Sequence, residues 1–207
     1  MKKIFFTIAL VALVLVSFTT LNTTTEVVNT IADTNEEVSF EGNVDVANSV
    51  LYWKGSKPTG SHNGTVNLKE GSMKVKNGKI KEGTFIIDMS TIKEDGGGKR
   101  LVGHLMNGDF FDVKKYPTAK FVVTKVKKKD GKLAVTGDLT IKNITKSITF
   151  LASISVDGEV VTFKSETFEV NRADFNVKYG SKSFFDNLKN KFINDMIEFS
   201  FEVKGTK

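Results

Sequence analysis

Residue types that support catalysis are scarce in this chain of 207 residues. It has no cysteine and two histidines, His62 and His104, and neither lies in a metal-ligand spacing such as His-Glu-x-x-His. A Gly-x-Ser-x-Gly motif for a nucleophilic serine is also missing. Asp109 and Asp112 lie three positions apart and could act as an acid–base pair, but we favour a role in capping turns. The sequence therefore predicts a protein that is not an enzyme and requires neither a metal nor a cofactor.

Phenylalanine carries the stronger signal, with 17 Phe against 3 Tyr and 1 Trp. Many of these residues fall at alternate positions of predicted strands, where side chains share one face of a sheet. Such an inward face either fills a core or lines an apolar ligand cavity, and both interpretations stay open at this point. The Phe110-Phe111 pair differs, because it lies between a predicted helix and a predicted strand. It is placed like a lid over one end of an apolar interior.

Lysine accounts for the formal net charge of +6. It alternates with apolar residues in two predicted hairpins, as expected for the solvent-facing side of strands. We therefore expect no nucleic-acid binding and at most a weak contact with a membrane surface. The two lysine clusters are Lys74, Lys76, Lys79 and Lys81 in one hairpin, and Lys125, Lys127, Lys128, Lys129 and Lys132 in the other.

The elements that would position these side chains are mostly strands. Alternation with period two is clear from Ile197 to Val203, where apolar residues alternate with Glu, Ser and Glu. Hairpin turns are predicted at Asn77-Gly78, Asp130-Gly131 and Asp157-Gly158, because the residues of such pairs tolerate positive φ. The sequence predicts an all-β fold, an antiparallel barrel of about eight strands with one or two short helices, over residues 98–106 and 183–190.

The first residues follow the pattern of an export signal. Lys2 and Lys3 precede an apolar run from Ile4 to Val16, which is short for a membrane span of about 20 residues. We predict a signal peptide over residues 1–20, a flexible acidic and polar linker over 21–42, and one domain over 43–207. The protein is then expected in the periplasm or outside the cell, with an uncleaved N-terminal anchor as the alternative.

Three motifs resemble those of the YceI family, in the family's order. The stretch from His104 to Phe121 contains Asp-Phe-Phe-Asp-Val-x-x-Tyr-Pro, and the others are VTGDLTIKNITKSI from Val135 to Ile148 and NRADF from Asn171 to Phe175. The resemblance extends over residues 43–204. It implies a lipocalin-like barrel of the bacterial cell envelope or exterior that binds polyisoprenoid chains, including isoprenoid quinones, in an elongated apolar tunnel.

The resulting hypothesis is a protein that carries or sequesters a long-chain isoprenoid lipid in its barrel. A ligand-free structural or interaction barrel is the alternative, and the oligomeric state stays open, with a homodimer as one option. Leu105, Phe110 and Phe111 would form the lid, and His104 or Asn171 would meet a polar head group. The apolar candidates for ligand contact are Leu105, Phe110, Phe111, Phe85, Ile87, Phe121, Val123, Leu139, Phe150, Phe163, Phe199 and Phe201.

Overall fold

A computed structural model describes residues 39–206, and these form mainly β-strands. The predicted signal peptide and most of the predicted linker lie outside the described residues. In chain order the elements are β1 (Ser39–Asn43), β2 (Asp45–Lys57), β3 (Gly60–Lys76), β4 (Lys79–Glu94), α1 (Lys99–Met106), β5 (Thr118–Lys129), β6 (Lys132–Ile141), β7 (Ile144–Asp157), β8 (Val160–Ser165), β9 (Phe168–Asn171), the 3-10 helices η1 (Arg172–Phe175) and η2 (Lys189–Lys191), and β10 (Met196–Thr206).

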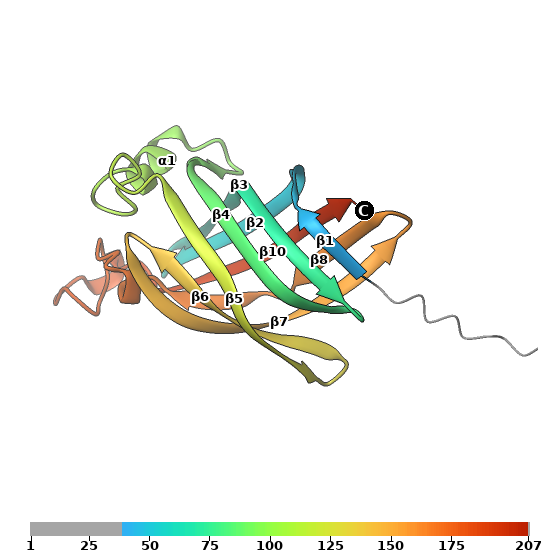
Figure 1. Cartoon of the computed structure of the whole chain (residues 1–207). Helices are drawn as coiled ribbons and strands as arrows, with labels where there is room; N and C mark the ends of the chain where they lie inside the picture. Colours follow the sequence, from blue (N-terminus) through green and yellow to red (C-terminus); the bar gives the residue numbers. More distant parts are fainter. Residues whose placement is uncertain (1–38, 207) are drawn as a thin grey trace, which may run out of the picture. The chain divides into compact units, whose positions relative to one another are not determined.

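The strands close into an antiparallel barrel of eight positions, as predicted (Figure 1). Closure comes from pairing of β3 with β4, which joins the two ends of the sheet. Strands β1 and β2 both pair with β3 and together fill one position, interrupted at Val44. Strands β8 and β9 likewise both pair with β10. A closed barrel leaves no long unpaired strand edge.

Tight turns set the register of the barrel. Asn77-Gly78 and Asp130-Gly131 form the predicted hairpin turns, with positive φ at both residues of each pair. The third prediction was displaced by one residue: Asp157 is still paired within β7, and the turn is made by Gly158 and Glu159. A further turn at Lys142-Asn143 (φ 49° and 61°) joins β6 to β7 and was missed because it contains no glycine.

Two sequence-based boundaries are corrected by the structure. Residues 183–190, predicted as a helix, form turns that lead into η2, because the left-handed conformations of Asn187 and Lys189 interrupt a regular helix. Residues 39–42, assigned to the linker, belong to β1. Phe40 is buried against the positions of Gly42 and Gly205, which explains why the strand begins there. The predicted helix over 98–106 is confirmed as α1.

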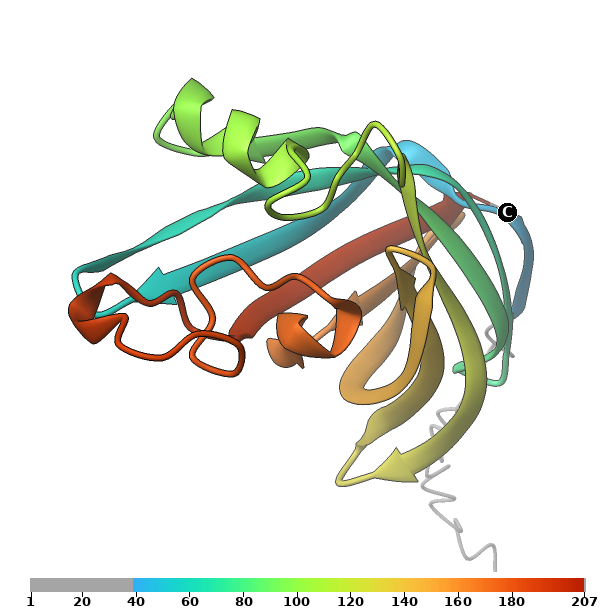
Figure 2. The same ribbon diagram turned by 90° about the vertical axis from the view of Figure 1, so that its left-hand side faces the viewer.

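The barrel is packed solid at the end opposite α1. Val75, Ile80, Val135 and Val161 at this end are at most 2% exposed, and the neighbouring strand β1 adds Phe40. We call this end the packed end. The other end, which we call the mouth, lies beside α1 and the segment between η1 and β10 (Figures 1 and 2).

Close approach of strands at the bend of β5 should make Gly137 intolerant of a side chain. The register of β5 against β6 shifts between Val123 and Lys125, and a Cβ at Gly137 would overlap the Phe121 ring and lie 2.5 Å from the Val122 carbonyl oxygen. We expect Gly137→Ala to lower the free energy of unfolding by about 1–3 kcal/mol, measured by urea denaturation.

Gly103→Ala is the matched control. Gly103 lies exposed in α1, and nothing is within 4 Å of a Cβ there. This change should leave stability equal or raise it by up to about 1 kcal/mol, since alanine favours a helix. Equal effects of the two substitutions would contradict the close approach at Gly137.

Candidate functional site: an apolar cavity at the mouth

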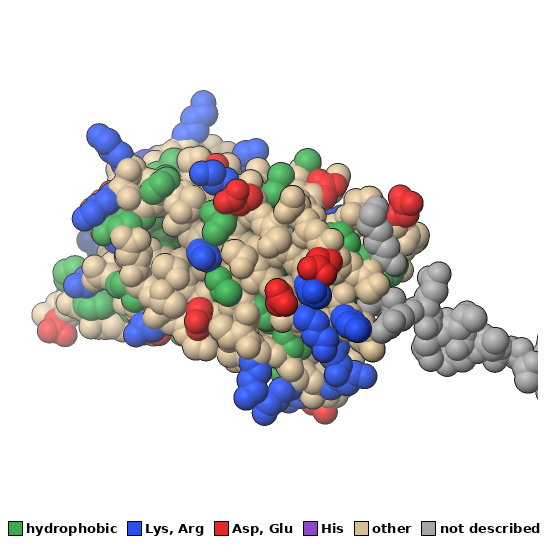
Figure 3. All heavy atoms as spheres, viewed as in Figure 1, with side chains coloured by type: hydrophobic (Ala, Val, Ile, Leu, Met, Phe, Trp, Pro, Cys, Tyr) green, Lys and Arg blue, Asp and Glu red, His purple; other side chains and the backbone are tan. Residues whose placement is uncertain are grey.

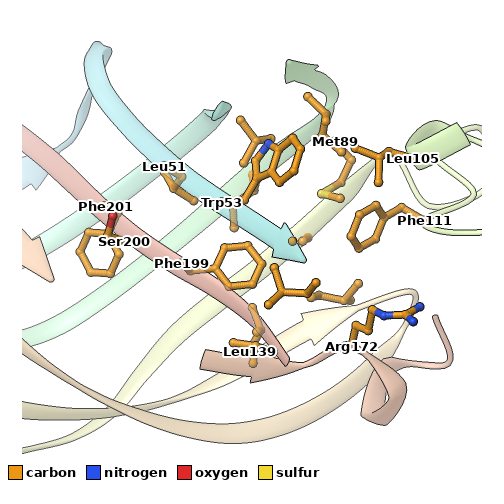
Figure 4. Close-up of a pocket in the computed structure, with 18 of the residues that line it drawn as sticks. Leu51, Trp53, Met89, Leu105, Phe111, Leu139, Arg172, Phe199, Ser200 and Phe201 are labelled. Carbon is orange, nitrogen blue, oxygen red and sulfur yellow. The ribbon is translucent and has the colours of Figure 1, made fainter. Parts of the chain in front are cut away.

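The mouth half of the barrel contains a cavity of about 270 Å³. This is far larger than the roughly 15 Å³ needed to hold one water. Its wall is built from the inward faces of strands, because alternate residues of each strand point to the interior. Strand β10 contributes Ile197, Phe199, Phe201 and Val203 at every second position. Figure 4 shows two of them, Phe199 and Phe201. The wall is therefore a direct consequence of period-two alternation.

Aromatic rings form the floor between the cavity and the packed end. Phe163 is fully buried, and its ring centroid lies 4.9 Å from that of Phe201 and 6.0 Å from that of Phe85. Phe150 stacks on Phe168 with centroids 4.6 Å apart. Rings in offset or tilted contact pack tightly, so the floor is fixed in position.

Polar groups that line the cavity are concentrated near the mouth. Ser56, Lys57 and His62 stand at the β2–β3 hairpin, where the cavity opens. His62 Nδ1 lies 3.2 Å from Glu94 Oε1, and the other Glu94 oxygen accepts a hydrogen bond from the Gly98 N–H at 2.8 Å. The Gly98 N–H, followed by His62, lowers the pKa of Glu94. Glu94 thereby links the rim of the barrel to the start of α1.

The Phe110-Phe111 segment closes part of the mouth, and its two rings have different roles. Phe110 is buried, with its ring centroid 5.5 Å from that of Tyr179. Phe111 is half-buried and lies against the cavity beside Leu105 (Figure 4). The segment is tied to α1 by the Phe111 N–H, which donates to the Leu105 carbonyl at 3.1 Å. Both rings line the cavity, and the buried Phe110 in addition anchors the segment through its contact with Tyr179.

Arg172 holds the segment from residue 176 to 195, which we call the mouth loop. The side chain is 4% exposed, and its carbon chain lines the cavity while the guanidinium points toward the loop (Figure 4). The guanidinium donates to the carbonyls of Val177, Tyr179, Ile193 and Asn194 at 2.9–3.1 Å. Asp195 lies 3.1 Å away, while burial lowers the pKa of Arg172. All five donors of a guanidinium suit such a cluster of acceptors.

The structure brings most of the predicted apolar residues together around this cavity. Phe85, Ile87, Leu105, Phe110, Phe111, Phe121, Leu139, Phe150, Phe163, Phe199 and Phe201 all line it.

Three predicted site residues lie elsewhere. Val123 packs on the core near Gly83, just before the bend in β5. His104 has a partly exposed ring 4.0 Å from the Asp109 carboxylate. The Asn171 side chain accepts the Ala173 N–H and caps η1, which occupies it structurally.

Several lining residues were missed by the sequence analysis. Trp53, Met89 and Phe168 follow the same alternation as their neighbours and could have been found from it. Ile193 could not, because it lies in a loop without periodicity. Arg172 was contained in the NRADF motif, but a charged residue gave no signal for an apolar wall.

Within residues 39–206 no group of three or more His, Asp or Glu side chains could hold a metal ion. None of the helices in that range is long and apolar enough to cross a membrane. Asp112 adopts positive φ in a turn, and the capping role that we favoured for its side chain stays a prediction.

Comparison with known proteins identifies relatives by sequence. Residues 30–205 match the model of the YceI-like domain. A UPF0312 protein of Pseudomonas putida is 35% identical over 122 residues, which are 56% of this chain and 63% of that protein. Protein YceI of Escherichia coli O157:H7 is 37% identical over 98 residues, or 44% of this chain and 51% of that protein. The matched part thus spans less than two-thirds of either relative.

Solved structures share the fold. BcnA of Burkholderia cenocepacia superposes with a TM-score of 0.61 at 22% identity, covering 79% of this chain and 99% of that one. A polyisoprenoid binding domain from Saccharophagus degradans superposes with a TM-score of 0.57 at 14% identity, covering 78% and 95% of the two chains. The barrel architecture is therefore common to these proteins.

Removal of the Arg172 guanidinium should destabilise the barrel strongly. Arg172→Met keeps the carbon chain but leaves four carbonyls and the Asp195 carboxylate without this partner. We therefore expect the free energy of unfolding, measured by urea denaturation, to fall by about 3–5 kcal/mol. Lys54→Met removes an exposed ion pair with Glu198 (2.8 Å) and should change stability by less than about 1 kcal/mol. A similar small change for Arg172→Met would contradict its role as anchor.

The link between Glu94 and α1 should weaken in acid. The folded-state pKa of Glu94 is lowered. The stability that Glu94 contributes is therefore fully present above the ordinary pKa of 4.5 and is lost as the pH falls through the folded-state pKa. The Gly98 amide resonance should therefore titrate in NMR with a midpoint below 4.5, and Glu94→Gln should abolish this titration. A midpoint at or above that value would refute the link.

Proposed function

The chain belongs to the family of YceI-like domains, and from this premise we propose that it binds a long-chain isoprenoid lipid, of the polyprenyl or isoprenoid-quinone type, in its barrel cavity. In this proposal the protein carries or sequesters the lipid without catalysing a reaction. It acts in the periplasm or outside the cell, where an apolar chain needs shielding from water. One solved neighbour is named a polyisoprenoid binding domain, which supports this ligand class.

The apolar cavity of about 270 Å³ is the observation that carries the proposal. Its deeper wall is formed by Phe, Leu, Ile and Val side chains, so an inserted hydrocarbon loses contact with water and meets no polar group that must be desolvated. Each buried CH₂ contributes about 0.8 kcal/mol, and an isoprenoid chain supplies many such groups. A branched, unsaturated chain also suits contact with aromatic rings.

The cavity argues against a ligand-free structural barrel. Such a barrel would be filled by its own side chains, as the packed end is. An enzyme acting on a bound lipid would require a polar cluster within the deeper wall. Ser200 lies between Phe199 and Phe201 and pairs with the exposed Tyr52, so its side chain is on the outer face of β10, while Ser56, Lys57 and His62 lie at the mouth. We infer that these mouth residues face the head of the lipid and that its chain lies inward.

Mass spectrometry of an organic extract tests the proposal directly. Protein purified without detergent from its native host should carry a stoichiometric isoprenoid lipid, and added polyprenol or quinone should bind to delipidated protein. An empty extract, together with no uptake of the added lipids, would overturn the proposal in favour of a structural barrel.

Changes to the cavity wall should weaken lipid binding while the fold is retained. Leu139→Trp projects a larger ring into the cavity, and Phe111→Asp places a charge on its wall, so each should lower the affinity for a fluorescent polyprenol about tenfold or more. Tyr52→Trp on the exposed outer surface is the control and should bind like wild type. Circular dichroism checks folding, and unchanged uptake by folded Leu139→Trp would contradict the assigned cavity.

A further inference from the structure

The mouth loop exposes an unusual share of large apolar side chains. Of the six exposed large hydrophobic residues within 39–206, Tyr179, Phe184 and Phe185 lie in this loop and Met196 follows it directly. Phe184 and Phe185 are 42% and 48% exposed. Scattered exposed apolar residues are ordinary, but a cluster marks an interaction surface. Figure 3 shows hydrophobic and basic side chains side by side at this end of the molecule.

The charge around these rings is positive. The loop carries four exposed lysines and two acidic residues, Asp186 and Asp195. Asp195 is paired with Arg172, so only Asp186 offsets the charge of the lysines. Two lysines pack on aromatic faces: Lys178 lies 4.8 Å from the Phe184 centroid and Lys182 lies 3.5 Å from that of Phe192. The lysines are Lys178, Lys182, Lys189 and Lys191.

The rings are held outward by a fixed base. Asp195 accepts hydrogen bonds from the hydroxyls of Ser181 and Ser183 at 2.8 and 2.7 Å, directly before the Phe pair. Arg172 binds carbonyls at both ends of the loop, and the Ile193 N–H donates to the Gly180 carbonyl at 2.8 Å. Because the base is tied at so many points, exposure of the rings is a property of the folded loop.

We propose that the mouth loop docks the barrel onto an anionic lipid bilayer, with Phe184 and Phe185 inserted among the acyl chains and the lysines at the phosphate level. An interfacial arrangement of aromatic rings beside lysines fits the polar and apolar layers of a bilayer surface. Ile193, from the same loop, lines the cavity, so the docking surface is continuous with the opening. A docked barrel would receive its lipid without moving that lipid through water, and in this respect the inference rests on the proposed function.

The lysine-rich β5–β6 hairpin serves as the comparison surface. Lys127 and Lys129 lie on the β5–β6 hairpin at the packed end, away from the mouth (Figure 1). That hairpin has similar positive charge, but no exposed large hydrophobic residue lies on it. The weak membrane contact that the sequence suggested for the two lysine-rich hairpins is therefore assigned here to a different surface.

Co-sedimentation of the full chain with cargo-free vesicles tests the inference. Wild type should bind vesicles of phosphatidylglycerol and phosphatidylcholine, and Phe184→Ser/Phe185→Ser should lower the partition coefficient about tenfold or more. Lys182→Gln/Lys191→Gln should lower it on the anionic vesicles, while the matched pair Lys127→Gln/Lys129→Gln should leave it within about twofold. Equal losses for the two lysine pairs would overturn the inference, because general charge attraction would then explain binding.

A local probe separates the loop from the rest of the chain. Tryptophan emission of Phe184→Trp should shift to shorter wavelength on anionic vesicles and be quenched by brominated lipid, and an unchanged spectrum would refute insertion. A dimer that dissociates in Phe184→Ser/Phe185→Ser, without vesicle binding by wild type, would instead identify a second copy as the occupant and overturn the bilayer assignment.

Uptake of detergent-dispersed polyprenol distinguishes this inference from the proposed function. The loop variants should lose vesicle binding but retain uptake, since the cavity wall deeper than Ile193 is untouched. Wild type that binds vesicles but takes up no polyprenol would support docking and overturn the lipid-carrier proposal. Wild type that takes up polyprenol but does not bind vesicles would support the lipid-carrier proposal and overturn docking.

Discussion

The buried guanidinium of Arg172 is the interaction on which the mouth of this barrel depends. It faces an apolar cavity with its carbon chain and satisfies four loop carbonyls and a carboxylate with its nitrogens. A long loop at a barrel rim carries many backbone groups that need partners, and one planar cation supplies five donors to them. The same side chain packs 5.7 Å from the Phe110 centroid, so the loop and the lid segment share one anchor.

The barrel is filled in one half of its length and hollow in the other. The packed end is filled by buried β-branched and aromatic side chains, and this burial drives folding. Because that end stabilises the closed sheet, the other half can remain hollow. The ring contacts of Phe150, Phe163 and Phe201 mark the boundary between the halves. Hollow space is destabilising in a core, so its position beside the mouth is consistent with use by a ligand.

The sequence predicted the parts of the fold that follow from period and turn chemistry. Alternation identified the walls of β4 and β10, and Asn-Gly and Asp-Gly pairs located two turns correctly. Prediction was wrong where tertiary contacts decide: Phe40 joins the barrel because Gly42 and Gly205 leave room for its ring, and residues 183–190 follow the Ser181–Asp195 anchor instead of a helical period. Arg172 shows the same limit, since two of its four carbonyl acceptors, Ile193 and Asn194, lie 21 and 22 residues further along the chain.

The first and last strands of the described barrel share one pole of the molecule. Strand β1 begins at Ser39 beside Lys76, and β10 ends at Thr206 beside Val160, so both ends emerge at the packed end (Figure 1). The first and last strands of the described barrel thus meet at the pole opposite the opening. A solid support attached at Thr206 would hold the molecule by its packed end and leave the mouth free to face a second surface.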